Sequence, residues 1–139
     1  MSTLEAKTIE RPQSGAENQF EVIVIFTRAQ TTMEAMKTAG KLAAGLRARI
    51  RVIVPQVIGK SGRSSKAKQF RLRTIVAGTR IETRLDLRPC ADQWEMLKQT
   101  LSPGSIVILG GSWGWWPTVE NRLARRLQAS GHHVLRPSN

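Results

Sequence analysis

Apolar residues of this chain fall into short runs separated by helical stripes, and their order predicts the fold. Residues 22–26, 50–54 and 106–109 are rich in β-branched side chains and show almost no polar alternation, which is typical of strands covered on both faces. Residues 80–88 alternate apolar and polar side chains, as expected for a strand with one face or one edge in water. A short last strand is predicted at residues 133–135.

Helices are predicted between these strands. Thr31 and Glu34 have the spacing of a capping box, and apolar residues recur at helical intervals after them, so the first helix is expected over residues 32–47. The segment 59–79 is less defined. Its first part is a loop by composition, and residues 70–76 fit either a strand or the end of a short helix, of which the helix is favoured because a crossover is needed there.

Two further helices are predicted in the second half of the chain. One begins near Asp92 and ends before Pro103. Its apolar stripe consists of Trp94, Leu97 and Leu101. The other runs from about Pro117 to Ser130. Its buried stripe is expected to consist of Val119, Leu123 and Leu127. Repeated strand-helix crossovers predict an α/β, Rossmann-like fold with an open, mainly parallel, five-stranded sheet and helices on both faces.

Chain length and cysteine content indicate the number of domains and the cellular compartment. With 139 residues the chain has room for one domain, which we place at residues 19–139 after a flexible N-terminal lead at residues 1–18. Cys90 is the only cysteine, so no intramolecular disulfide forms and a reducing compartment is favoured. No apolar run approaches the ~20 residues that span a bilayer. We therefore expect a cytoplasmic protein without membrane insertion.

Positive charge is concentrated in one third of the chain. The formal net charge is +12, and no acidic residue occurs between Glu34 and Glu82, where twelve basic residues lie. Two interpretations remain open: a solvated basic face, or a surface within residues 35–81 that binds nucleic acid, another polyanion or an acidic protein partner. For the second, the candidate residues are Lys60, Arg63, Lys66, Lys68, Arg71 and Arg73.

A glycine-rich turn follows the predicted strand at residues 106–109. A turn of this kind before a helix leaves backbone N–H groups free and allows an anion to approach closely. In open α/β sheets the ligand lies at the carboxyl ends of strands where the strand order reverses, which would place this turn beside residues 26–32. A turn that needs glycine only for its backbone angles is the alternative. The candidate donors are Gly110, Gly111, Ser112 and Gly114.

The order of elements over residues 20–137 resembles the universal stress protein family. The resemblance implies a non-catalytic regulatory or stress-response binding module that forms a homodimer. It also implies a ligand cleft made by residues 27–32 and 110–117, in which Arg28 favours an anionic ligand over a metal-bound one.

The nucleotide motif of that family is incomplete here. Members that bind ATP carry Asp at the end of the first strand, where this chain has Thr27 followed by Arg28. They also carry Gly-x2-Gly-x9-Gly-[Ser/Thr] after the fourth strand. Gly111 and Gly114 match its first half, whereas Ala124-Arg125 occupies the place of its second half. We therefore expect no tightly bound cofactor, and ATP or another adenine nucleotide is disfavoured.

Other candidate residues carry weaker signals. Three tryptophans in the glycine turn, at positions 113, 115 and 116, suit either base stacking, a subunit contact or a cover for the sheet end. His132-His133 lacks neighbouring ligands for a metal, and Cys90 lacks a nearby base, so both are interpreted as structural. No acidic residue lies in the two turns expected to form the cleft, and an enzyme is not predicted.

Overall fold

Five parallel strands form one sheet in the order β3-β2-β1-β4-β5. The computed structural model describes residues 20–57, 81–111 and 118–137. The strands are β1 (Glu21–Ile25), β2 (Arg49–Val57), β3 (Thr83–Cys90), β4 (Ile106–Ile108) and β5 (His133–Leu135). Every pairing between neighbours is parallel. The predicted fold class is therefore confirmed, and β3, the strand with alternating polarity, lies at one edge.

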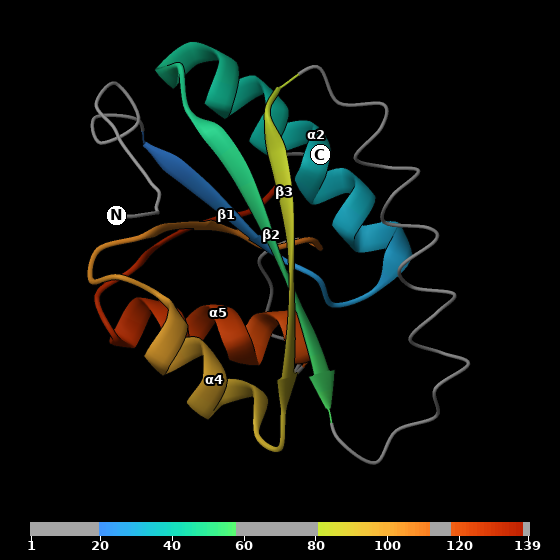
Figure 1. The fold of residues 1–139 in the computed structure, drawn as a ribbon, viewed down its shortest axis with the longest axis vertical. Coiled ribbons are helices and arrows are strands. Elements are labelled where there is room, and N and C mark those ends of the chain that lie inside the picture. The colour runs from blue at the N-terminus through green and yellow to red at the C-terminus, as the bar shows by residue number, and fades with distance from the viewer. Residues whose placement is uncertain (1–19, 58–80, 112–117, 138–139) are drawn as a thin grey trace, which may run out of the picture.

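Helices cover both faces of this sheet. The described helices are α2 (Ala29–Leu46), α4 (Gln93–Thr100) and α5 (Val119–Ala129). Figure 1 shows α2 on one side of the sheet and α4 and α5 together on the other. Because successive side chains of a strand point to opposite faces, β1 contributes Val22 and Val24 to the core under α2, and Ile23 and Ile25 to the core under α4 and α5. The continuous apolar run of β1 follows from this double burial.

The first helix begins earlier than predicted. Its N-cap is Arg28, which has extended backbone angles, so Thr31 lies in the first turn and does not cap it. The capping-box prediction was wrong because the Thr31 hydroxyl is engaged elsewhere, as described below. The predicted start of a helix near Asp92 is confirmed, because the Asp92 side chain caps α4 by accepting a hydrogen bond from the Glu95 N–H, 3.1 Å away.

The buried stripe of α5 also differs from the prediction. Leu123 and Leu127 are buried as expected, but Val119 is 60% exposed. The helix instead buries Glu120 in its first turn, so the stripe is displaced by one position at its start. It begins at Val119 with Thr118 as the N-cap, whereas the sequence predicted a start near Pro117, which lies outside the described residues.

One charged side chain interrupts the apolar run of β2. Arg51 pairs in register with Ile23 of β1, so it points to the face covered by α4 and α5. Its Nε donates to Asp86 of β3 at 2.9 Å, and its Nη1 lies 3.7 Å from the Glu21 carboxylate. Burial acts to raise the pKa of Asp86, but hydrogen bonds from Arg51 and Arg88 hold it below its ordinary value. These acids offset the cost of a guanidinium beside the core.

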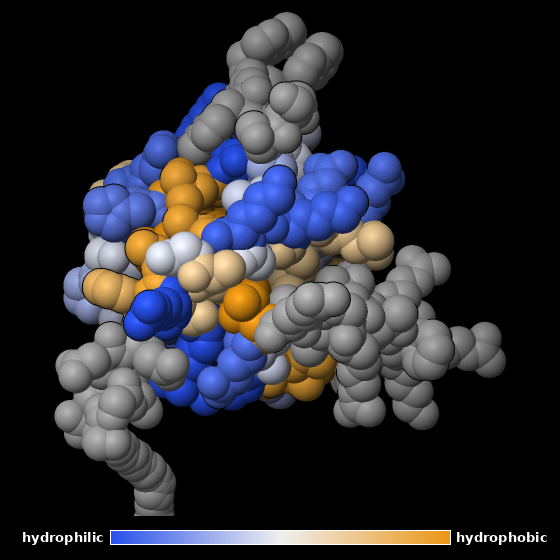
Figure 2. All heavy atoms as spheres, turned by 90° about the horizontal axis from the view of Figure 1, so that it is seen from above, coloured by the Kyte–Doolittle hydropathy of each residue, from blue (hydrophilic) through white to orange (hydrophobic). Residues whose placement is uncertain are grey.

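One face of the described surface combines hydrophilic and hydrophobic side chains. Figure 2, seen from above, shows hydrophilic side chains around a smaller hydrophobic area. Among the described residues, the large apolar side chains that remain exposed are Phe20, Met33, Leu46, Val119 and Leu135. None of the described helices is both long and apolar enough to cross a bilayer. The N-terminal lead and the segment 59–79 lie outside the described residues.

The ion pairs of Arg51 are expected to stabilise the sheet measurably. Arg51→Ala leaves Asp86 half-buried without its main partner, and we expect it to lower the free energy of unfolding by about 1–3 kcal/mol. Urea denaturation measures the change. Arg84→Ala is the control, because Arg84 is 65% exposed and lies 3.7 Å from Glu21, so it should cost less than about 1 kcal/mol. Equal losses in the two variants would contradict this assignment.

Candidate functional site

The ends of β1 and β4 meet at the carboxyl edge of the sheet. These neighbouring strands are followed by helices on opposite faces, α2 after β1 and α5 after β4. The strand order reverses between them, and open α/β sheets bind ligands at such a point. Thr27 and Arg28 follow β1, and Gly110 and Gly111 follow β4. The structure thus places these four predicted residues around one edge, whereas Ser112 and Gly114 lie outside the described residues.

A buried carboxylate occupies this edge. Glu120, in the first turn of α5, is 1% exposed, and its Oε2 accepts hydrogen bonds from Thr27 Oγ1 at 2.8 Å and from Arg28 Nε at 3.1 Å. Arg28 Nη2 lies 3.4 Å from Oε1, so the guanidinium engages both oxygens. A carboxylate therefore lies beside Thr27, the position at which the nucleotide motif described above has an Asp. It comes from α5 and not from the end of β1.

Thr31 completes the set of donors. Its Oγ1 is 3.1 Å from Glu120 Oε2 and 3.3 Å from the carbonyl oxygen of Arg28, so its single proton is shared between these two acceptors. Thr31 lies in the first turn of α2, a turn that contains no acidic residue of its own. Glu120 therefore places a negative charge at the positive end of the α2 dipole from another part of the chain.

The ionisation state of Glu120 follows from these contacts. Burial alone would raise the pKa of the carboxyl group, but hydrogen bonds from Arg28 and Thr27, together with the charge of Arg28, hold it below its ordinary value. The carboxylate is therefore ionised at neutral pH and forms an ion pair with Arg28. The Arg28 side chain is 66% exposed, so it covers the carboxylate and also faces solvent.

Arg136 fixes the other side of the site. Following β5, it donates from Nε and Nη2 to the carbonyl oxygen of Gly110 at 3.1 and 2.8 Å, and from Nη1 to Asn121 Oδ1 at 2.9 Å. Burial lowers the pKa of Arg136, and the negative charge of Glu120 opposes this effect. The guanidinium stays charged, because arginine does not deprotonate in proteins. It joins the end of β4 to the start of α5.

Gly110 and Gly111 are required for different structural reasons. Gly110 lies against the first turn of α2, where a Cβ atom would overlap the Thr31 carbonyl group. Gly111 has φ of 79°, in the left-handed region, and a Cβ there would lie 2.9 Å from Arg136 Nη2. Both glycines are thus required by packing and backbone angle. Their backbone geometry alone is not evidence of a ligand.

Thr31 lies within the predicted cleft range 27–32, although its spacing to Glu34 was interpreted as that of a helix cap. Sequence reasoning missed Glu120, Asn121 and Arg136. The first was recoverable, because Glu120, Leu123, Ala124 and Leu127 follow the i, i+3, i+4, i+7 spacing of a buried face. The two turns contain no acidic residue, as the sequence indicated, but Glu120 reaches the cleft from the first turn of α5. The role of Arg136 carries no local signal in the sequence.

The remaining predicted residues either lie outside the described part of the chain or occupy other parts of the fold. Of the basic candidates, Lys60, Arg63, Lys66, Lys68, Arg71 and Arg73 all lie outside the described residues. Cys90 is buried at the end of β3. His132 accepts a hydrogen bond at Nδ1 from the Ser105 N–H, 3.2 Å away, and burial lowers its pKa. No group of metal-ligating side chains is present among residues 20–57, 81–111 and 118–137.

The close approach of Gly110 to α2 gives a stability prediction. We expect Gly110→Ala to lower the free energy of unfolding by at least about 2 kcal/mol, because the added methyl group displaces either α2 or the end of β4. Gly40→Ala is the matched control. Nothing lies within 4 Å of the new Cβ at this position inside α2, so the same change should raise stability by about 0.5–1 kcal/mol. Thermal denaturation of both variants distinguishes the two signs.

The lowered pKa of Glu120 gives a pH prediction. A carboxyl group whose pKa is lower in the folded protein stabilises the fold above its unfolded-state value, 4.5, and this stabilisation is lost as the pH falls through the folded-state value. We therefore expect the stability difference between wild type and Glu120→Gln to shrink between pH 6 and pH 3. Urea denaturation at several pH values measures it. A difference that is independent of pH would show that the carboxylate gains nothing from Arg28.

Three solved structures of universal stress proteins are similar to this chain. A protein of that family from Burkholderia pseudomallei has a TM-score of 0.52 and 17% identity, over 85% of this chain and 96% of its own. A universal stress protein in complex with cAMP has a TM-score of 0.52 and 14% identity, over 87% and 100%. The protein from Archaeoglobus fulgidus has a TM-score of 0.54 and 9% identity, over 86% and 98%. No family model and no curated protein matches the sequence. The chain has the universal stress protein fold.

Proposed function

We propose that the protein is a non-catalytic regulatory module of the universal stress protein type, which binds a small anionic ligand weakly at the edge formed by Thr27, Arg28 and Gly111. The observation that supports this most is Arg28, a largely exposed guanidinium at the N-terminus of α2, beside the point where the strand order reverses. The candidate ligand is a phosphate ester such as an adenine nucleotide. One structure of similar fold is a complex with cAMP, which supports this class of ligand.

Weak binding follows from the ion pair. Arg28 and the first turn of α2 already share the carboxylate of Glu120, at 3.1 Å from each donor atom. An incoming phosphate must compete with this internal anion for the same guanidinium, and it also approaches a negative charge. The affinity of the site for anions is therefore lower than that of an unpaired arginine at a helix N-terminus.

The chemistry of the side chains supports a non-catalytic role. Thr27 donates its hydroxyl proton to Glu120 at 2.8 Å, which has the geometry of a nucleophile and a base. However, the pKa of Glu120 is lowered, so its carboxylate is a poor proton acceptor near neutral pH. Its oxygens also bind Arg28 and Thr31. These contacts suit a structural anion better than a general base.

Polyanion binding through residues 35–81 is the second candidate, and the described residues support it less. Lys37, Lys41 and Arg47 are exposed on or just after α2. In contrast, Arg51 is largely buried and paired with Asp86 and Glu21, and Arg49 lies 3.9 Å from Glu21. Part of the basic segment is thus neutralised within the sheet.

The proposal predicts how substitutions change anion affinity. Isothermal titration calorimetry with ADP and with inorganic pyrophosphate should give dissociation constants on the order of 1 mM for the wild type, equivalent to about 4 kcal/mol. Glu120→Gln should strengthen binding by about five- to tenfold, because it releases Arg28 from its internal partner. Arg28→Ala should abolish measurable binding.

Lys37→Ala is the matched control, since it removes one exposed positive charge from the same helix at a distance from the cleft. It should leave both affinities within a factor of about two. The proposal fails if neither wild type nor Glu120→Gln binds either anion, or if Lys37→Ala weakens binding as much as Arg28→Ala does.

A further inference from the structure

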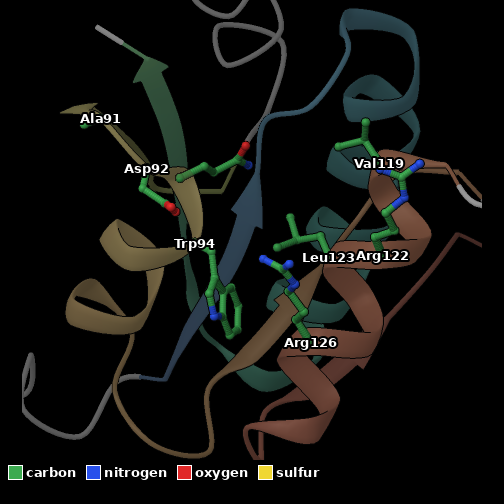
Figure 3. A pocket seen from close by; sticks show the side chains of 8 residues that line it. Ala91, Asp92, Trp94, Val119, Arg122, Leu123 and Arg126 are labelled. Atoms are coloured by element: carbon green, nitrogen blue, oxygen red, sulfur yellow. The ribbon is translucent and has the colours of Figure 1, made fainter.

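A second concave site lies between α4 and α5. It has a cavity volume of about 400 Å³, within the range of ~300–1,000 Å³ that small-molecule sites occupy. The first turn of α5 separates it from the cleft, because Glu120 bonds to Thr27 on the cleft side whereas the neighbouring Val119 lines this cavity. Side chains from the start of α4 and from Val119 to Arg126 of α5 surround it (Figure 3).

The walls of this cavity expose apolar surface. Trp94 of α4 is partly buried against the core, and its indole faces Leu123 and Arg126 of α5 (Figure 3). Leu123 belongs to the buried core, and Val119 at the rim is 60% exposed. A planar apolar group placed between Trp94 and these side chains would remove their surface from water, which favours binding at about 25 cal/mol per Å².

Positive charge lies beside this apolar surface. The guanidinium carbon of Arg126 is 5.7 Å from the centroid of a Trp94 ring, within the ~6 Å reach of a cation–π contact. Arg122, one turn earlier on α5, also lines the cavity. Among the described residues, Asp92 is the acidic side chain of the lining, and one of its oxygens accepts the Glu95 N–H as the cap of α4. The described part of the lining therefore carries two guanidinium groups and one carboxylate.

We propose that this cavity is a binding site for a planar aromatic anion. The ring stacks on the indole of Trp94, and the acidic group, a carboxylate, sulfonate or phosphate, pairs with Arg126. The proposal goes beyond the anion cleft, because the two sites share no side chain among the described residues and an aromatic ring is required here. Arg126 lies over the Trp94 ring in the unliganded protein, so in the complex its guanidinium moves from the indole face to the acidic group of the ligand.

A fluorescent aromatic sulfonate tests the proposal directly. 8-Anilinonaphthalene-1-sulfonate should bind the folded protein saturably at one site, with a blue-shifted increase in its emission. Arg126→Glu should weaken this binding by about tenfold, because it reverses the charge that meets the sulfonate. Arg125→Glu makes the same change at the preceding position of α5, which is exposed and is not among the residues that line the cavity. It should change the affinity by less than about twofold. Circular dichroism verifies that both variants are folded.

A neutral analogue separates anion recognition from apolar adsorption. N-phenyl-1-naphthylamine has the same ring system without the sulfonate, and it should bind at least about fivefold more weakly to the wild type. Arg28→Ala and Glu120→Gln should leave binding of the sulfonate unchanged, because these residues belong to the cleft. These two variants therefore test the cavity separately from the anion-binding cleft.

Proton–nitrogen correlation spectra place the probe. The chain has four tryptophans, so Trp94→Phe identifies the Trp94 indole N–H signal by its disappearance. Titration of the wild type with the sulfonate should shift this signal more than the other three indole signals. The inference is overturned if the largest shift is at another indole, if the neutral analogue binds equally well, if Arg126→Glu and Arg125→Glu have the same effect, if Arg28→Ala abolishes binding, or if binding is not saturable.

Discussion

A buried carboxylate must keep its hydrogen-bond donors, and this requirement connects two segments that are distant in the sequence, residues 27–31 and Glu120, at the carboxyl edge of the sheet. Glu120 enters from α5, whereas its donors follow β1 and begin α2. Removing Arg28 leaves the buried carboxylate with only the two threonine hydroxyl groups as donors, and the loss of a charged partner from a buried ion pair is destabilising. The orientation of α5 relative to α2 therefore depends on this cluster as well as on the apolar core, and Gly110 permits the close approach that it needs.

The total charge of the chain differs from the charge at its cleft. A net charge of +12 suggests strong attraction of anions, yet the guanidinium at the cleft is balanced by an acid within hydrogen-bond distance. Long-range potential and local affinity are thus separate properties of this molecule. The first increases the rate at which anions approach, and the second depends on whether Arg28 can exchange one anionic partner for another. Positive charge also lies in the cavity between α4 and α5, where the guanidinium groups of Arg122 and Arg126 are close to the indole of Trp94.

The sequence predicts the fold well, because a buried strand can be recognised from a short run of contiguous apolar residues. The β-branched run of β1 and the cap of α4 at Asp92 each need only neighbouring positions to be recognised. The site depends on contacts across the fold. Thr31 resembles a cap by spacing, but its hydroxyl bonds to a residue 89 positions away. Arg136 acts on the carbonyl of Gly110, a group that every residue carries, so no side-chain pattern marks the contact.

The cluster around Glu120 also limits how related sequences can diverge. A chain that loses the acid retains a guanidinium and two hydroxyl groups arranged for an anion, and a chain that loses Arg28 retains a buried negative charge. Single changes are therefore costly in either direction, whereas simultaneous replacement by apolar side chains of similar volume can be tolerated. The effects of substitutions at positions 27, 28, 31 and 120 are consequently coupled, so the cost of changing one of these residues depends on which residues occupy the other three.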